Sequence, residues 1–131
     1  GDDLKGKRFA LWGLAFKPNT DDIREAPALE VINELLKCGA TVCAFDPEAM
    51  KNVKTKLDDK IEYATSQYEC LTGADALIIA TEWNEFRNPD FQRMAGSLKN
   101  KVIFDGRNLF DLDDMREYGF HYESIGRSIV N

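Results

Sequence analysis

Short, fully apolar runs alternate along this chain with amphipathic helical patterns, and this alternation restricts the fold more than any other feature. Residues 77–80 read Leu-Ile-Ile-Ala and residues 102–104 read Val-Ile-Phe, with no polar residue to mark a side that faces water. Such runs are typical of strands that are covered on both faces. Strands that alternate with helices predict a mostly parallel sheet with helices packed on its two sides.

The expected fold class is therefore α/β: a Rossmann-like, doubly wound, mostly parallel sheet of five or six strands with helices on both faces. The first helix should begin at Pro27 and end before Gly39, because proline favours the first helical position and glycine the residue beyond the last turn. The strands are expected at residues 8–12, 41–45, 76–80, 101–104 and 120–123, with a short extended piece at 60–63. Further helices are expected after an Asp46 cap, after a Ser66–Glu69 capping box, at residues 88–95 and at residues 111–118.

Length and charge limit the class of protein. The 131 residues predict one domain, spanning 1–131, and the net charge of −6 argues against binding to nucleic acid or to a membrane surface. No apolar run approaches the roughly 20 residues that span a bilayer, and no signal-peptide pattern is present. The three cysteines are odd in number and lack framework spacing, which favours reduced thiols in a cytoplasmic protein. With one histidine, they do not make a metal site.

The connection between the first strand and the first helix carries the strongest functional signal. It covers residues 13–26, about fourteen residues, where about 2–6 are usual, and it contains Lys17 and Arg24. In an open parallel sheet, ligands bind beyond the carboxyl ends of the strands. Other loops at that edge carry Arg107 and Arg127, so four cations are expected there together with several carboxylates. Since arginine and lysine bind phosphate and carboxylate groups, the edge is a candidate site for an anionic ligand.

The usual dinucleotide fingerprint is absent from this edge. After the first strand only Gly13 is present, and Ala15 and Lys17 stand where further glycines would let the backbone approach a pyrophosphate. Asp46 ends the second strand, in the position of a ribose-binding acid. Without the glycine turn, a capping role describes Asp46 better. The pattern therefore indicates a Rossmann-like fold that has changed its ligand.

Several other polar residues at this edge have structural interpretations. Asp21 and Asp22 lack the further ligands that a metal would need, and we interpret them as ordering the loop through local bonds, with Arg24 as a candidate partner of the pair. Trp83 fits a packing role better than contact with a ligand. The sequence leaves Glu82 undecided, and a structural role is favoured for Arg127.

Three strings carry a resemblance to a known family. G-L-A-F-K-P-N-T-D-D-I-R-E-A-P occupies residues 13–27, A-T-E-W-N-E-F occupies 80–86, and F-D-G-R-N occupies 104–108. In this order they resemble the last, UDP-binding domain of UDP-glucose 6-dehydrogenase and related sugar-nucleotide enzymes, the UDP-glucose/GDP-mannose dehydrogenase family. The resemblance runs from about residue 5 to residue 127. It implies the C-terminal part of a larger enzyme.

The resemblance also implies roles for particular residues. Phe16 and Lys17 match the pair that contacts the UDP-sugar, and Arg107 matches a further arginine that contacts substrate. Arg24 matches an arginine that reaches the NAD held mainly by the other Rossmann domain. The family oxidises UDP-glucose to UDP-glucuronate with two NAD⁺, through a cysteine in an earlier domain, and none of the three cysteines here lies in that motif. The chain is therefore expected to bind UDP-glucose without catalysing, and no catalytic or metal residue is assigned.

The same resemblance implies partners and a location for this chain. The partners are UDP-glucose and the upstream NAD-binding and central domains, and the setting is cytoplasmic nucleotide-sugar metabolism and polysaccharide biosynthesis. The full enzyme is expected to be a homo-oligomer that assembles through its central domain, which leaves this part free to be monomeric.

Three alternatives remain open. The chain can be the same domain of a GDP-mannose or UDP-aminosugar dehydrogenase, although the Thr-Glu-Trp string at residues 81–83 favours UDP-glucose. It can be a non-catalytic, flavodoxin-like signalling or interaction module, but a receiver domain needs an acidic pair after the first strand and an aspartate after a middle one. Residues 12–13 and 80–81 supply neither. A plain structural scaffold is the third alternative.

Overall fold

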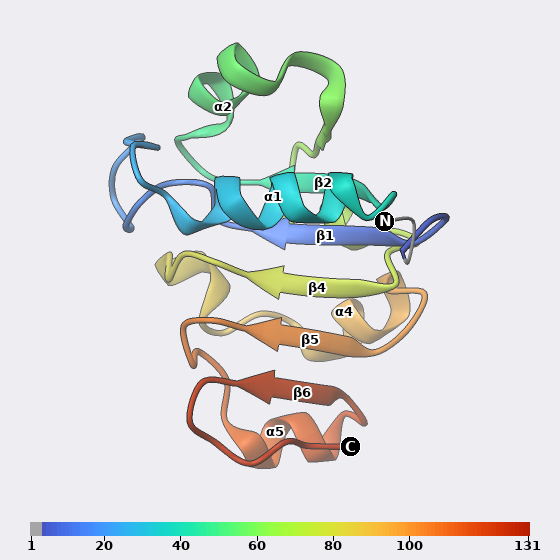
Figure 1. Ribbon diagram of the computed structural model, residues 1–131. Helices are drawn as coiled ribbons and strands as arrows, with labels where there is room; N and C mark the ends of the chain where they lie inside the picture. Colours follow the sequence, from blue (N-terminus) through green and yellow to red (C-terminus); the bar gives the residue numbers. More distant parts are fainter. Residues whose placement is uncertain (1–3) are drawn as a thin grey trace.

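The apolar runs form one six-stranded sheet in the computed structural model, which describes residues 4–131 (Figure 1). The strand order is β3-β2-β1-β4-β5-β6, and all neighbouring strands are parallel. This confirms the α/β, Rossmann-like fold that the sequence predicts, including the short extended piece, which is β3. The strands are β1 (Arg8–Trp12), β2 (Thr41–Phe45), β3 (Glu62–Tyr63), β4 (Ala76–Ile79), β5 (Val102–Asp105) and β6 (His121–Ser124).

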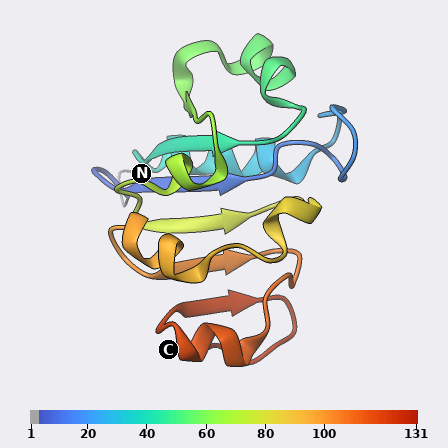
Figure 2. The ribbon, with the colours of Figure 1, turned by 180° about the vertical axis from the view of Figure 1, so that it is seen from behind.

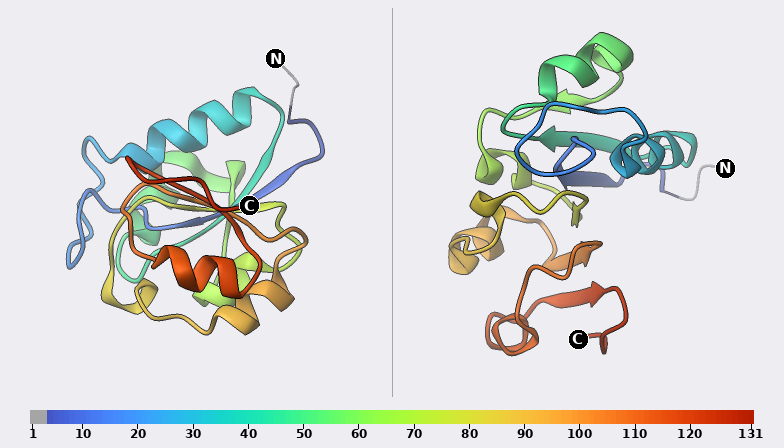
Figure 3. Two further views of the ribbon diagram at one scale, coloured as in Figure 1. Left: turned by 90° about the horizontal axis from the view of Figure 1, so that it is seen from below. Right: turned by 90° about the vertical axis from the view of Figure 1, so that its left-hand side faces the viewer.

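Helices pack on both faces of the sheet (Figures 2 and 3). One buried cluster joins α1 and α2 to the side chains of β1 and β2 on one face of the sheet. A second cluster joins α3, α4 and α5 to the opposite face. The two clusters make the fold doubly wound, because the chain changes faces after β3. The helices are α1 (Pro27–Lys37), α2 (Met50–Leu57), α3 (Gln67–Leu71), α4 (Phe91–Ser97) and α5 (Leu112–Glu117), with 3-10 turns at Asp58–Lys60 and Asn84–Phe86.

Two helix starts differ from those that the sequence predicts. The helix expected after Asp46 begins only at Met50, because the Asp46 carboxylate accepts from the amides of Glu48 and Ala49 in a turn that comes before the helix. The helix expected at residue 88 begins at Phe91, where the Asp90 side chain accepts a bond of 3.0 Å from the amide of Arg93. In both cases the local cap pattern indicated a helix but misplaced its first residue.

The topology produces a switch point between β1 and β4. These strands are neighbours in the middle of the sheet, and the chain leaves them toward opposite faces. Ligands of open α/β sheets bind beyond the carboxyl ends of the strands at such a point. No helix among residues 4–131 is long and apolar enough to cross a bilayer.

Candidate functional site

The long first loop is fixed where it leaves β1. Gly13 has a φ of 97°, and a Cβ placed on it would lie 2.5 Å from the Cβ of Thr81, so no side chain fits at this position. The amide of Gly13 donates to the carbonyl of Phe45 at 2.8 Å, and the Thr81 hydroxyl donates to the carbonyl of Ala15 at 2.8 Å. The ends of β1, β2 and β4 are therefore held together at the switch point.

A fully buried carboxylate, that of Asp46, completes this anchor. Sequence reasoning expected a cap, and the carboxylate does accept from two amides of the turn that follows β2. It also clamps the first loop, which no local pattern indicates. Because five N–H groups use its acceptor positions, no site remains for a ribose hydroxyl. The donors are the amides of Leu14 at 2.7 Å and Ala15 at 3.0 Å, those of Glu48 and Ala49 at 2.8 Å, and the Trp83 indole at 3.2 Å.

The tip of the loop extends beyond the sheet (Figure 1). It presents an aromatic ring and a cation to solvent. The Phe16 side chain is half exposed, at 50%, and Lys17 is exposed as well. Among residues 4–131, no carboxylate forms a salt bridge with Lys17. The amide of Phe16 donates to the carbonyl of Asp22 at 2.7 Å, which turns the chain back toward the sheet. Both candidate substrate residues of this loop are therefore accessible.

Asp22 and Arg24 order the returning part of the loop. The guanidinium of Arg24 donates to both oxygens of Asp22, at 3.1 and 3.0 Å, and the Arg24 amide donates to the same carboxylate at 2.9 Å. These bonds lower the pKa of Asp22 from its ordinary 3.8 to about 2. The loop-ordering interpretation of Asp22 is therefore confirmed. Arg24 keeps 86% of its side chain exposed despite this pair, so its remaining donors are open to another partner.

Arg107 lies on the other side of the switch point, just beyond β5. Its amide donates to one Asp105 oxygen at 2.8 Å, and its guanidinium donates to Glu82 at 2.7 Å. Glu82 also accepts from Arg87 at 3.2 Å, and the two arginines, Arg107 above all, lower the pKa of the Glu82 carboxyl. Glu82 is therefore the partner of Arg107. Sequence reasoning missed Arg87, whose one signal was its place five residues after Glu82.

Arg127, the fourth cation, belongs to a network that holds the Arg107 loop. Its guanidinium donates to the Tyr122 hydroxyl at 2.7 Å and to the carbonyl of Phe110 at 2.9 Å. The Tyr122 hydroxyl in turn donates to buried Asp105 at 2.6 Å, and burial, together with this carboxylate, raises the pKa of Tyr122. Arg127 thus has the structural role that the sequence favoured.

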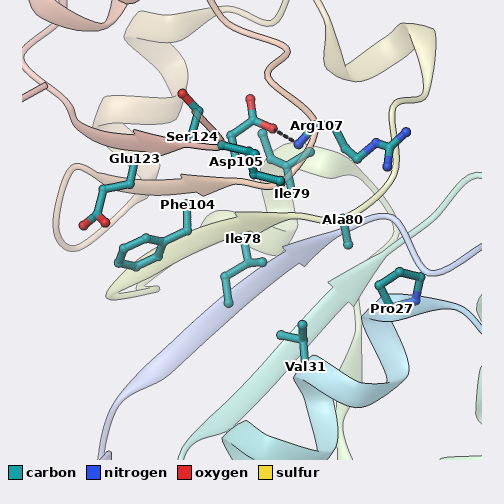
Figure 4. Close-up of a pocket in the computed structure, with 12 residues that line it drawn as sticks. Pro27, Val31, Ile78, Ile79, Ala80, Phe104, Asp105, Arg107, Glu123 and Ser124 are labelled. Carbon is teal, nitrogen blue, oxygen red and sulfur yellow. Dashed lines mark hydrogen bonds between the residues drawn. The ribbon is translucent and has the colours of Figure 1, made fainter. Parts of the chain in front are cut away.

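Two of the hollows along this edge involve the candidate site residues. One, of about 580 Å³, opens beside the switch point on the face that carries α1, with Pro27, Ala80 and Arg107 around its mouth (Figure 4). The other, of about 310 Å³, is lined by Phe16, Arg24 and two carboxylates. The structure therefore brings Phe16 and Arg24 together but places Arg107 at a different hollow, and Lys17 lines neither of them.

The residues of the edge do not fit a dinucleotide in its usual position. Gly13 stands alone, and the carboxylate of Asp46 has no acceptor left. Within residues 4–131, no three histidine, cysteine or acidic side chains gather in a way that would hold a metal ion. Cys43 and Cys70 are buried, and Cys38 is partly buried, all three as free thiols. The Cys43 contact and burial raise the pKa of Cys70, which is the opposite of what a nucleophile needs.

Comparison with known proteins shows the family to which this chain belongs. The UDP-glucose/GDP-mannose dehydrogenase family, UDP binding domain, matches residues 10–112. UDP-glucose 6-dehydrogenase of Rhizobium meliloti strain 1021 is 46% identical over 127 residues, which cover 97% of this chain and 29% of that protein. The chain thus spans less than a third of the length of this relative.

Solved structures agree with the fold and with the family. A UDP-glucose dehydrogenase from Pyrobaculum islandicum has a TM-score of 0.72 and 38% identity, over 81% of this chain and 23% of its own. An NDP-N-acetyl-D-galactosaminuronic acid dehydrogenase from Methanosarcina mazei Go1 has a TM-score of 0.82 and 27% identity, over 96% and 26% of the two chains. In both cases this chain is similar to one part of a larger dehydrogenase.

Proposed function

The chain belongs to the UDP-glucose/GDP-mannose dehydrogenase family, as its UDP-binding domain, and we propose that it holds UDP-glucose for oxidation to UDP-glucuronate by a longer, NAD-dependent enzyme. In this proposal, residues 1–131 act as one UDP-sugar-binding domain. They position the nucleotide while other domains supply NAD⁺ and the catalytic cysteine. Binding energy from the nucleotide is then realised as orientation at the sugar carbon that reacts.

One observation carries the proposal: the two family strings that bear cations lie at the same edge of the sheet, on either side of the switch point. The first presents Phe16 and Lys17 on the exposed loop tip, and the second presents Arg107 beside β5. A diphosphate suits this combination, because lysine acts as a point charge and arginine as a planar fork. The Phe16 ring offers an apolar surface next to Lys17.

Arg24 is proposed to contact the dinucleotide rather than the UDP-sugar. Its guanidinium is exposed, and this chain has no usual dinucleotide position of its own, so the NAD would be held by another domain. NAD supplies the hydride acceptor when it is bound there. Arg24 would only help to orient it.

Titration of the chain with UDP, UDP-glucose, GDP and NAD⁺, followed by amide chemical shifts, tests the ligand class. We expect uridine nucleotides to shift the amides of residues 13–26 and 105–108, and Lys17→Ala or Arg107→Ala to weaken those shifts. Lys51→Ala, an exposed lysine of α2, is the matched control and should change nothing. A preference for GDP, or shifts confined to another edge, would refute the proposal.

Kinetics of the longer enzyme test the roles of individual residues. Lys17→Ala or Arg107→Ala should raise the KM for UDP-glucose, with a loss on the order of 1.5–3 kcal/mol for a charged hydrogen bond. Arg24→Ala should weaken the dependence on NAD⁺ instead. Unchanged kinetics in the first two variants, or an effect of Arg24→Ala on UDP-glucose alone, would contradict these assignments.

A UDP-aminosugar is the second candidate substrate, because a structure similar to this chain is that of an aminosugar-type dehydrogenase. The nucleotide contacts would be the same, so only the preference of the longer enzyme among sugars separates the two. We further propose a cytoplasmic location, which the three free thiols support, and a homo-oligomeric full enzyme.

A further inference from the structure

Three charged side chains meet beyond the ends of β4 and β5. The Glu82 carboxylate divides its two oxygens between two arginines: Oε1 accepts from Nη2 of Arg107 at 2.7 Å, and Oε2 accepts from Nη2 of Arg87 at 3.2 Å. The Arg107 side chain extends from its loop toward the end of β4 to reach this carboxylate (Figure 4). Arg87 directly follows the second family string and has no part in the proposed function.

The backbone on either side of Glu82 is held by buried neighbours. The Thr81 hydroxyl donates to the carbonyl of Ala15 at 2.8 Å, and the Trp83 indole donates to Asp46 at 3.2 Å. Both neighbours are almost completely buried. The Glu82 carboxylate therefore projects from a fixed point, and it can move only by rotation of its own side chain.

Arg87 is held in a similar way, at the end of the second 3-10 turn. Its amide donates to the carbonyl of Asn84 at 3.1 Å, and the preceding Phe86 is fully buried, with its ring stacked on Trp12 at 5.0 Å between centroids. In the described part of the chain, Glu82 is the one carboxylate that forms an ion pair with Arg87. The turn therefore places a cation beside the second oxygen of Glu82.

The shared carboxylate affects what Arg107 can bind. An anion that approaches Arg107 also meets the negative charge of Glu82, which repels the anion and holds the guanidinium. With Arg107 as its single partner, Glu82 would lose its ion pair when the anion took that arginine. Arg87 gives the half-buried carboxylate a second partner, so Arg107 can be released without leaving Glu82 unpaired. Both arginines lower the pKa of Glu82, Arg107 more than Arg87, which agrees with a shared pair.

We propose that Arg87 is a positioning residue of the UDP-sugar site, which retains Glu82 when a phosphate of the ligand takes Arg107. This inference rests on the proposed function, in which Arg107 contacts the UDP-sugar. Arg87 does not touch the ligand and acts only through Glu82, by keeping the carboxylate away from the phosphate. The exchange replaces one partner of Arg107 by another, and every charged group keeps a partner of opposite charge.

A double-mutant cycle in the longer enzyme, with UDP as ligand and without NAD⁺, tests the inference. Arg87→Gln should weaken UDP binding about two- to fivefold in calorimetric titration, because Glu82 then pairs with Arg107 alone. In a Glu82→Gln background the same change should alter the affinity less than about 1.5-fold, since no carboxylate remains to be retained. Arg116→Gln is the matched control, because Arg116 also forms an exposed ion pair, with Asp113 on α5, and it should leave UDP binding unchanged.

Steady-state kinetics separates positioning from a structural role. Arg87→Gln should raise the KM for UDP-glucose by the same factor as the affinity change, and it should leave kcat and the KM for NAD⁺ unchanged. This pattern is expected because the lost interaction affects nucleotide binding equally in the ground state and the transition state. Partial unfolding of the enzyme would lower kcat instead, and that result would overturn the inference.

The shared pair is also measured without any ligand. Carboxyl ¹³C shifts of the same enzyme should show a rise in the pKa of Glu82 in Arg87→Gln and a larger rise in Arg107→Gln. No rise in Arg87→Gln would overturn the inference, because Arg87 would then not be a partner of Glu82.

The outcomes separate this inference from the proposed function. Equal weakening by Arg87→Gln with and without Glu82 would mean that Arg87 acts on the ligand directly, and UDP binding that ignores Arg87→Gln would mean that it has no role. Either result overturns the inference while UDP binding itself stands. Absence of UDP binding in the unaltered enzyme would instead refute the proposed function.

Discussion

Two buried carboxylates, Asp46 and Asp105, occupy matching places on opposite sides of the switch point. Asp46 follows β2 and Asp105 ends β5, and each accepts backbone amides from the loop beside it. They differ in what else they bind. Asp46 is satisfied by five uncharged N–H donors, whereas Asp105 accepts from Tyr122, whose hydroxyl accepts from Arg127.

This difference shows two ways of holding a ligand loop. The root of the Lys17 loop depends on one carboxylate that is sealed from solvent and is local to the switch point. The Arg107 loop depends on a series of three side chains that ends in a partly exposed guanidinium. The first arrangement should be rigid and intolerant of change, and the second should be weaker and responsive to its surroundings.

Asp46→Ala should produce the largest effect. It leaves buried N–H groups without an acceptor, and we expect the free energy of unfolding to fall by about 3–5 kcal/mol in urea titration. Asp46→Asn keeps the shape and one acceptor oxygen, so it should give an intermediate loss. A loss below about 1 kcal/mol for Asp46→Ala would mean that the loop root relaxes, and the contrast with Asp105 would disappear.

Tyr122→Phe should cost less, about 1–3 kcal/mol, because Asp105 keeps its two backbone donors. The loss caused by Arg127→Met should overlap with that of Tyr122→Phe, since both variants remove the hydrogen bond between Arg127 and Tyr122. The double variant should therefore lose less stability than the sum of the two single variants. Urea titration of the four proteins in this cycle measures the coupling. Additive losses would show that Tyr122 and Arg127 act independently.

Glu82→Gln should barely change stability, by about 0.5 kcal/mol or less, since its pairs with arginine are partly exposed to solvent. It should tighten UDP binding about two- to tenfold, because the carboxylate then no longer competes with phosphate for Arg107. Glu85→Gln, on the neighbouring turn, is the matched control. Calorimetric titration measures the affinity of both variants for UDP. Weaker binding by Glu82→Gln would show instead that Glu82 orients Arg107 for the ligand.

Asp22 extends the comparison to an exposed carboxylate and should show the smallest effect on folding. Its folded-state pKa is lowered to about 2 from 3.8, so its pair with Arg24 stabilises the loop above pH 3.8. That contribution is lost as the pH falls through about 2. Arg24→Gln should return the pKa of Asp22 toward 3.8, as measured by carboxyl ¹³C shifts against pH. An unchanged pKa in this variant would show that Arg24 is not its cause.

The parts of the fold that the sequence predicted well are those with local causes. The strand at residues 8–12 and the helix from Pro27 have the predicted bounds, because apolar runs and a proline at the first helical position act within a few residues. The family strings also placed Arg107 and Lys17 at one edge, since the carboxyl ends of parallel strands share an edge. Their contacts with a UDP-sugar stay a prediction.

The parts that the sequence did not predict depend on contacts between distant residues. Glu82 and Arg107 are 25 positions apart, and Asp46 lies 32 positions from Leu14 and 37 from Trp83. A carboxylate after a strand looks the same in sequence whether it caps a turn or clamps another loop. The choice depends on which donors the sheet brings beside it.

The sequence by itself therefore determined the class of fold, the edge that carries the cations and the family to which the chain belongs, because periodicity and short motifs are local. Only the tertiary structure decided that Asp46 is saturated and that Glu82 holds Arg107. Each of these depends on how many partners surround a group in three dimensions, and strand order alone brings those partners together.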